Sequence, residues 1–126
     1  MIELRKEDRF IPRDGAYAVF SPAFTKRGPL LDIGRHGLSC IYYVNTIFRP
    51  RIIDRFVNLR VGSFILTDLP FRIVEDFRIS GESSGSLKSI RQRSIEFDQL
   101  TPNQAMQLDY LIENLTNKGL GKLAGI

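Results

Sequence analysis

Residues 30–44, LLDIGRHGLSCIYYV, predict two β-strands joined by a short glycine loop. The flanking segments, 30–33 and 38–44, are rich in aliphatic, aromatic and β-branched side chains, which favour extended chain. Gly34 and Gly37 permit backbone conformations that other residues avoid, and a close approach to a ligand. The loop should therefore join two strands at one end of a sheet, and a loop on such a scaffold is a common place for a binding site.

The rest of the chain reads mainly as further strands. Five stretches have suitable composition and are separated by proline, glycine or polar residues: 16–20, 52–61, 64–67, 71–79 and 87–97. The run Asp68-Leu69-Pro70 is expected to separate the third from the fourth. In residues 71–79, four apolar side chains follow a period of two and should share one face: Phe71, Ile73, Phe77 and Ile79.

One helix is expected at the end of the chain, at about residues 102–117. Thr101 has the position of an N-cap, Pro102 that of the first helical residue, and Gln104 completes a capping box. Apolar residues then recur at i, i+3, i+4 and i+7, which predicts one buried face: Leu108, Leu111, Ile112 and Leu115. The glycine-rich residues 118–126 read as a flexible tail. The pattern predicts an all-β barrel, at about residues 16–98, with a packed C-terminal helix.

Length and composition fit one globular domain covering residues 1–126. The chain is 43% hydrophobic and 25% charged. It has no apolar run long enough for a membrane span, and MIELRKEDRF at its start is too charged for a secretory peptide, so we expect a cytoplasmic protein. The lone Cys40 lies in an apolar run and reads as a small buried hydrophobe. No enzymatic motif, such as a nucleophile elbow or H-E-x-x-H, is present, and we expect no enzyme and no cofactor.

Charge is distributed unevenly along the chain. Residues 1–60 contain 11 Lys and Arg against 6 Asp and Glu, whereas residues 61–126 contain 7 against 8. This asymmetry should steer an anion toward the N-terminal half. Nucleic acid is not the expected anion, because the arginines are scattered along predicted strands and no helix-turn-helix or aromatic RNA-binding signature is visible.

Two arginines near the N-terminus, Arg5 and Arg9, stand four residues apart, and Arg13 repeats the spacing. Residues 1–15 are polar and interrupted by proline and glycine, which predicts a movable arm. A guanidinium suits a phosphate or the O6/N7 edge of guanine, and the Asp32 carboxylate can accept from guanine N1 and N2. The arm and the loop together indicate a site for a guanine-containing anion.

These residues resemble the PilZ domain family, whose signature is R-x-x-x-R followed by [D/N]-x-S-x-x-G. Arg5 and Arg9 match the first half, Asp32 and Gly37 match the second, and Gly34 replaces the usual serine. The resemblance covers residues 5 to 116. It implies a six-stranded antiparallel barrel and a receptor for cyclic di-GMP, in which the arm clasps the ligand.

The resemblance makes Arg5, Arg9, Asp32, Gly34 and Gly37 the main candidate ligand-binding residues. Further candidates are Arg13, the loop residue His36, and Arg91 with Arg93, which a β-bulge in their strand could aim at the site. His36 is the only histidine and has no second ligand nearby, so no metal site is expected. The relay of binding would need an effector protein or another copy of the chain.

Plainer interpretations remain open. The two N-terminal arginines can belong to a solvated terminal segment, and the residues of the loop can simply build a turn. Gly34 also leaves open a PilZ-like adaptor that has lost its ligand and has a structural role.

Overall fold

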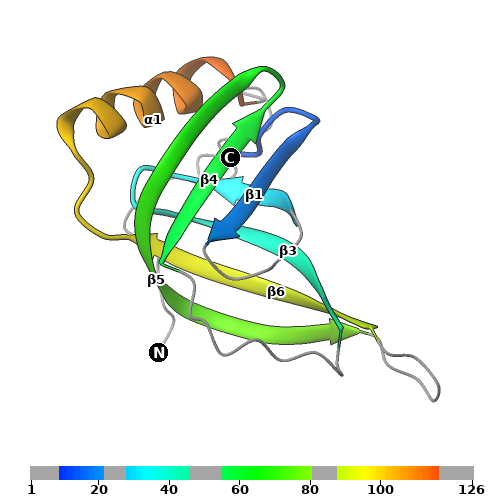
Figure 1. Cartoon of the computed structure of the whole chain (residues 1–126). Helices are drawn as coiled ribbons and strands as arrows, with labels where there is room; N and C mark the ends of the chain where they lie inside the picture. Colours follow the sequence, from blue (N-terminus) through cyan, green and yellow to red (C-terminus); the bar gives the residue numbers. More distant parts are fainter. Residues whose placement is uncertain (1–8, 22–27, 46–54, 81–87, 117–126) are drawn as a thin grey trace, which may run out of the picture.

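The computed structural model describes residues 9–21, 28–45, 55–80 and 88–116 (Figure 1). Six antiparallel strands form a closed barrel in the order β1-β2-β3-β6-β5-β4, and one helix follows them. The predicted six-stranded barrel with a C-terminal helix is confirmed. The elements are β1 (Ala16–Ser21), β2 (Gly28–Ile33), β3 (Gly37–Asn45), β4 (Phe56–Val61), β5 (Phe64–Ser80), β6 (Lys88–Phe97) and α1 (Pro102–Asn114).

The expected break at residues 68–70 is wrong, because β5 continues through it. Leu69 is fully buried and pairs with Val57, and Pro70 pairs with Phe56. Asp68 adopts a positive φ of 60°, and its N–H donates to the Asn58 side-chain oxygen at 2.7 Å. The turn-forming residues therefore make an irregularity within a paired strand, since burial and cross-strand pairing outweigh local turn preference.

The bulges also differ from the expectation. β3 and β6 pair without interruption from Gly37↔Glu96 to Asn45↔Lys88, so no bulge between them re-aims the β6 arginines. The register shifts along β6 lie on its other side, in β5, where Val74 and Ile79 are the extra residues. β5 is the long, curved strand that pairs with β4 along its first half and with β6 along its second (Figure 1).

The apolar alternation predicted for residues 71–79 is broken by the first of these bulges. Ile73 pairs with the buried Ile95, whereas Phe77 pairs with Gln92. Because Ile95 and Gln92 differ by an odd number of positions, Ile73 and Phe77 lie on opposite faces of the sheet. The prediction that they share a face is therefore wrong: one extra residue reverses the alternation.

The barrel is filled by side chains from every strand, and α1 covers one end of it. Leu108, Leu111 and Ile112 are the buried residues of the helix and belong to the same core as the strands, whereas Leu115 packs against it and is only partly buried. The capping box forms as predicted: Gln104 N–H donates to Thr101 Oγ1 at 3.1 Å, and Thr101 N–H donates to the Gln104 side chain at 3.0 Å. Cys40 is fully buried, as expected, and burial raises the pKa of its thiol to about 12.

The chain from Arg9 to Arg13 connects β2 with the end of α1. Phe10 and Ile33 exchange two backbone hydrogen bonds, each 2.9 Å long. Pro12 forms a bridge with Thr116, and Arg13 N–H donates to the Leu115 carbonyl at 3.0 Å. This part of the predicted arm is therefore paired with the body of the domain. Within the described residues, no helix has the length and apolar character needed to cross a membrane.

Candidate functional site

Arg9 and Asp32, two residues separated by 22 others in the sequence, lie in direct contact. Arg9 Nη1 donates to Asp32 Oδ1 at 2.6 Å, and the two side chains are 15% and 22% exposed. The pairing of Phe10 with Ile33 brings them together, because each is the neighbour of a paired residue. The structure thus joins one predicted arginine to the predicted carboxylate. Arg5, the other main arginine, lies outside the described residues.

The pair lies on the outer face of the barrel. Ile33 is fully buried in the core, so its neighbour in the strand, Asp32, belongs to the opposite, outward face. Asp32 pairs with Ser39 of β3, and Ser39 pairs with Ser94 of β6, which places the three side chains in one outward row. The two serines, whose side-chain oxygens lie 2.9 Å apart, were not predicted. The alternation along each strand predicts which side chains share a face with each serine. The sequence does not show which residues lie opposite them on the neighbouring strands.

The glycine loop closes tightly between β2 and β3. Gly34 N–H donates to the Gly37 carbonyl at 2.8 Å. A Cβ on Gly37 would lie 2.1 Å from the Ile95 carbonyl oxygen, so the close approach of β6 requires glycine there. Among the described glycines, positive φ occurs at Gly15 and Gly62. The expected unusual backbone at the loop is therefore not found, and Gly37 has a packing role.

The two residues inside the loop point to different partners. Arg35 reaches α1, where its guanidinium contacts Asp109 Oδ1 at 2.7 Å and Glu113 Oε2 at 3.4 Å. His36 is exposed, and its carbonyl accepts from Phe97 N–H at 2.8 Å. Across the described ranges, no cluster of three or more His, Cys, Asp or Glu side chains could hold a metal ion. The loop therefore links the outward row to the helix.

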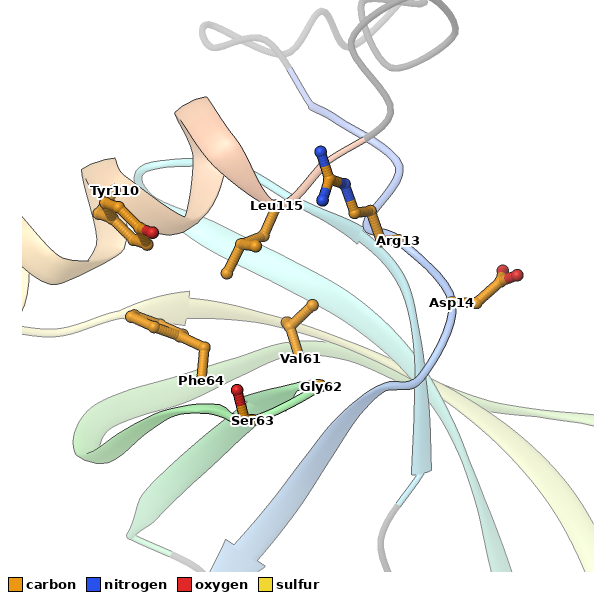
Figure 2. A pocket seen from close by; sticks show the side chains of 8 residues that line it. All are labelled: Arg13, Asp14, Val61, Gly62, Ser63, Phe64, Tyr110 and Leu115. Carbon is orange, nitrogen blue, oxygen red and sulfur yellow. The ribbon is translucent and has the colours of Figure 1, made fainter.

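Arg13 lies in a separate depression, between α1 and the turn that joins β4 to β5. Figure 2 shows its side chain at the rim of this pocket, with Phe64 and Tyr110 on the far side. The pocket has a volume of about 500 Å³ and is lined by Arg13, Asp14, Val61, Gly62, Ser63, Phe64, Tyr110 and Leu115. Asp32 is not among these residues, so the structure does not join Arg13 to the Arg9–Asp32 pair.

Arg91 and Arg93 are directed to the inner side of the sheet, away from Asp32. Arg93 pairs with Cys40 and Asp76 across the strands, and its guanidinium stacks between two rings, 4.7 Å from Phe20 and 4.5 Å from Tyr42. Arg91 shares this face because it lies two residues away. The two arginines predicted to line the site thus belong to a second, interior cluster with Asp76 and Tyr42.

The interior cluster is tightly hydrogen-bonded. Arg91 Nε and Arg93 Nε donate to the two carboxylate oxygens of Asp76 at 2.6 and 2.9 Å, and the Tyr42 hydroxyl donates to the same group at 2.6 Å. Burial by itself raises the pKa of Asp76, but the hydrogen bonds from Tyr42, Arg91 and Arg93 outweigh it and the pKa is lowered. Burial and the bond to Asp76 raise the pKa of Tyr42. The cluster therefore holds a charged carboxylate in place.

The fold matches two solved structures. The PilZ domain of YcgR from Escherichia coli, solved with c-di-GMP, aligns with a TM-score of 0.62 and 15% identity over 90% of this chain and 92% of that one. MrkH, a c-di-GMP-dependent transcription regulatory factor, aligns with a TM-score of 0.65 and 13% identity. That alignment covers 90% of this chain but only 52% of the MrkH chain, so this chain spans about half the length of MrkH. No family model and no curated protein matches. The chain therefore has the fold of a PilZ domain.

Proposed function

We propose that this protein is a PilZ-family receptor that binds cyclic di-GMP on the outer face around Arg9 and Asp32, and relays binding to a partner in the cytoplasm without catalysis. The observation that carries the proposal is the contact between the motif arginine and the motif carboxylate. The order of the sequence motifs supports it. So do the two structural neighbours, one solved with c-di-GMP and the other dependent on it.

The chemistry of the pair suits an exchange of partners. Arginine can give two parallel hydrogen bonds to guanine O6 and N7 or to a phosphate, and the carboxylate can accept from guanine N–H donors. A partly exposed ion pair contributes about 0–1 kcal/mol, whereas a bidentate contact to a base is worth about 1–3 kcal/mol. A ligand that replaces the Arg9–Asp32 contact with two new contacts is therefore favoured. Arg5 is the second arginine that we assign to the ligand.

Isothermal titration calorimetry with cyclic di-GMP tests the proposal. Arg9→Ala should weaken binding about fivefold to 150-fold, the loss expected for one bidentate contact. Arg60→Ala is the matched control, because Arg60 is exposed on β4 and its Nε donates to the Gly62 carbonyl. Binding should also weaken as salt rises. The absence of heat up to about 1 mM ligand, or an unchanged Arg9→Ala titration, would contradict the receptor proposal.

A PilZ-like adaptor without a ligand is the second candidate, and Gly34 is the observation that favours it. Glycine lacks the motif hydroxyl, and a hydrogen bond from that group would contribute about 0.5–3 kcal/mol, depending on the charge of its partner. A wild-type protein that is silent in calorimetry, together with a Gly34→Ser variant that binds, would identify such an adaptor. Serine is compatible with the backbone at this position, since positive φ among the described glycines is confined to Gly15 and Gly62, and thermal unfolding of the variant checks that it is folded.

A further inference from the structure

The pocket between α1 and the turn that joins β4 to β5 has the properties of a binding site, and the proposed nucleotide site does not use it. Its volume of about 500 Å³ lies within the range of ligand-binding pockets, about 300–1,000 Å³. Val61 is buried, whereas Phe64 and Leu115 are only partly buried against the core. The pocket therefore offers apolar side chains that a ligand can cover.

The rim of the pocket carries a positive charge at Arg13. This residue is exposed, and its backbone N–H donates to the Leu115 carbonyl at 3.0 Å, which holds it at the end of α1. Among the residues that the structure describes, no side chain pairs with its guanidinium. Asp14 also lines the pocket, but Figure 2 shows its carboxylate pointing away from Phe64. The guanidinium thus favours an anionic group on whatever enters the pocket.

The acidic residues of α1 do not supply that anion. Asp109 and Glu113 both contact the guanidinium of Arg35, which belongs to the loop between β2 and β3. Apolar side chains instead continue from the pocket along the helix. Met106 and Tyr110 are both more than half exposed, and their i, i+4 spacing places them one turn apart on the same face. An apolar surface that extends beyond the pocket fits a peptide segment better than a compact small molecule.

We propose that this pocket docks a short segment of a partner protein in which a carboxylate stands beside large apolar side chains. The carboxylate accepts a charge-assisted hydrogen bond from the Arg13 guanidinium. The apolar side chains cover the rings of Phe64 and Tyr110, whose centroids lie 5.5 Å apart. The proposal goes beyond the cyclic di-GMP site, since it concerns a different surface and needs no nucleotide.

NMR spectroscopy of the backbone amide signals of the full chain, titrated with two blocked peptides, tests the proposal. Acetyl-Gly-Glu-Leu-Phe-Gly-amide carries the expected chemistry, and acetyl-Gly-Gln-Leu-Phe-Gly-amide lacks only the charge. The Glu peptide should shift the signals of residues that line the pocket, such as Gly62, Phe64 and Leu115. It should also bind at least about fivefold more tightly than the Gln peptide.

Single substitutions separate the charged from the apolar part of the contact. Arg13→Ala should remove the preference for the Glu peptide. Tyr110→Ala should weaken both peptides about twofold to tenfold, whereas Tyr110→Phe keeps the ring and should bind like the wild type. Arg55→Ala is the matched control, because Arg55 is an exposed arginine that immediately precedes β4, and the pocket lies at the other end of that strand. Thermal unfolding of each variant checks that it is folded.

Several outcomes would overturn the proposal. They are the absence of shifts up to about 5 mM Glu peptide, equal affinity for the two peptides, and shifts centred on Asp32 instead of the pocket. Pocket signals that move with protein concentration in the absence of peptide would assign the surface to a second copy of the chain. Each of these results leaves the receptor proposal intact, because the titration contains no cyclic di-GMP and calorimetry with the nucleotide is a separate measurement.

Discussion

The outer Arg9–Asp32 pair and the inner Arg93–Asp76 pair join the same two residue types at similar distances, 2.6 and 2.9 Å. Their side-chain exposures are also similar, at 15% and 22% against 10% and 18%. What differs is the face of the sheet. Asp76 has side-chain donors from three residues of β3 and β6, and Arg93 is enclosed by two aromatic rings. The outer pair instead joins the N-terminal segment to β2, close to the glycine loop.

An arginine–carboxylate contact does not by itself indicate a ligand site. A carboxylate held by several groups on rigid strands loses many contacts if it changes partner. Arg9 belongs to the N-terminal segment and not to a strand, so its contact with Asp32 can be exchanged for a ligand at lower cost. The inner pair is therefore expected to stabilise the barrel, and the outer pair to bind.

The largest expected effect is at the inner pair. Asp76→Ala leaves Arg91 and Arg93 without their shared carboxylate, and should lower the free energy of unfolding by about 3 kcal/mol. Urea unfolding measures the loss, with the exposed Asp14→Ala as control. Cyclic di-GMP affinity should stay the same while the protein is folded. A loss below about 1 kcal/mol would remove the distinction between the two pairs.

The stability of the Asp76→Ala variant should also depend on pH differently from that of the wild-type protein. Because the folded-state pKa of Asp76 is lowered, its stabilisation is complete above the unfolded-state value of about 3.9 and is lost as pH falls through the folded-state pKa. The difference in stability between wild type and Asp76→Ala should thus be constant from pH 7 to 5 and shrink below about pH 4. A difference in stability that grows as the pH falls below about 4 would contradict a lowered pKa for Asp76.

An intermediate loss of stability is expected at Gly37, where β6 packs closely against the backbone. Gly37→Ala places a methyl group against the Ile95 carbonyl, and should cost about 1–3 kcal/mol of stability through overpacking. Gly15→Ala is the comparison variant. It measures the cost of a positive φ without crowding, since Gly15 has a φ of 83° and open space around an added Cβ. Gly37→Ala with unchanged stability in urea and weaker ligand binding would instead give this glycine a role in the outer site.

The smallest expected effect is at the loop residue Arg35. Its contacts to Asp109 and Glu113 are about half exposed, and such surface ion pairs contribute about 0.2–1 kcal/mol each. Arg35→Ala removes both contacts and should lower the free energy of unfolding by less than about 2 kcal/mol, and by less still at high salt. Urea unfolding at low and high salt checks this. A loss comparable to that of Asp76→Ala would show that the link from the loop to α1 is structural.

The elements with strong local signals could be predicted from the amino-acid sequence alone. The capping box at Thr101 and Gln104 fixed the start of α1, the apolar stripe gave its buried face, and the glycine loop gave the junction of β2 and β3. These signals depend on hydrogen bonds and periodicity within a few residues, so they are readable along the chain. The motif spacing identified Arg9 and Asp32, which the structure places in contact.

The residues that share a face of the sheet, or lie close together in space, could not be predicted in this way and are seen in the folded barrel. The extra residue Val74 reversed the alternation in β5, and pairing with β4 carried the strand through Pro70. The unbroken register of β6 against β3 turned Arg91 and Arg93 inward to Asp76. The pairing of β2 with β3, and of β3 with β6, put Asp32, Ser39 and Ser94 in one row across three strands. Register and bulges follow from the free energy of pairing and burying whole strands, and shifting a strand by one residue moves every side chain to the other face. That information is distributed over distant segments, and no local pattern contains it.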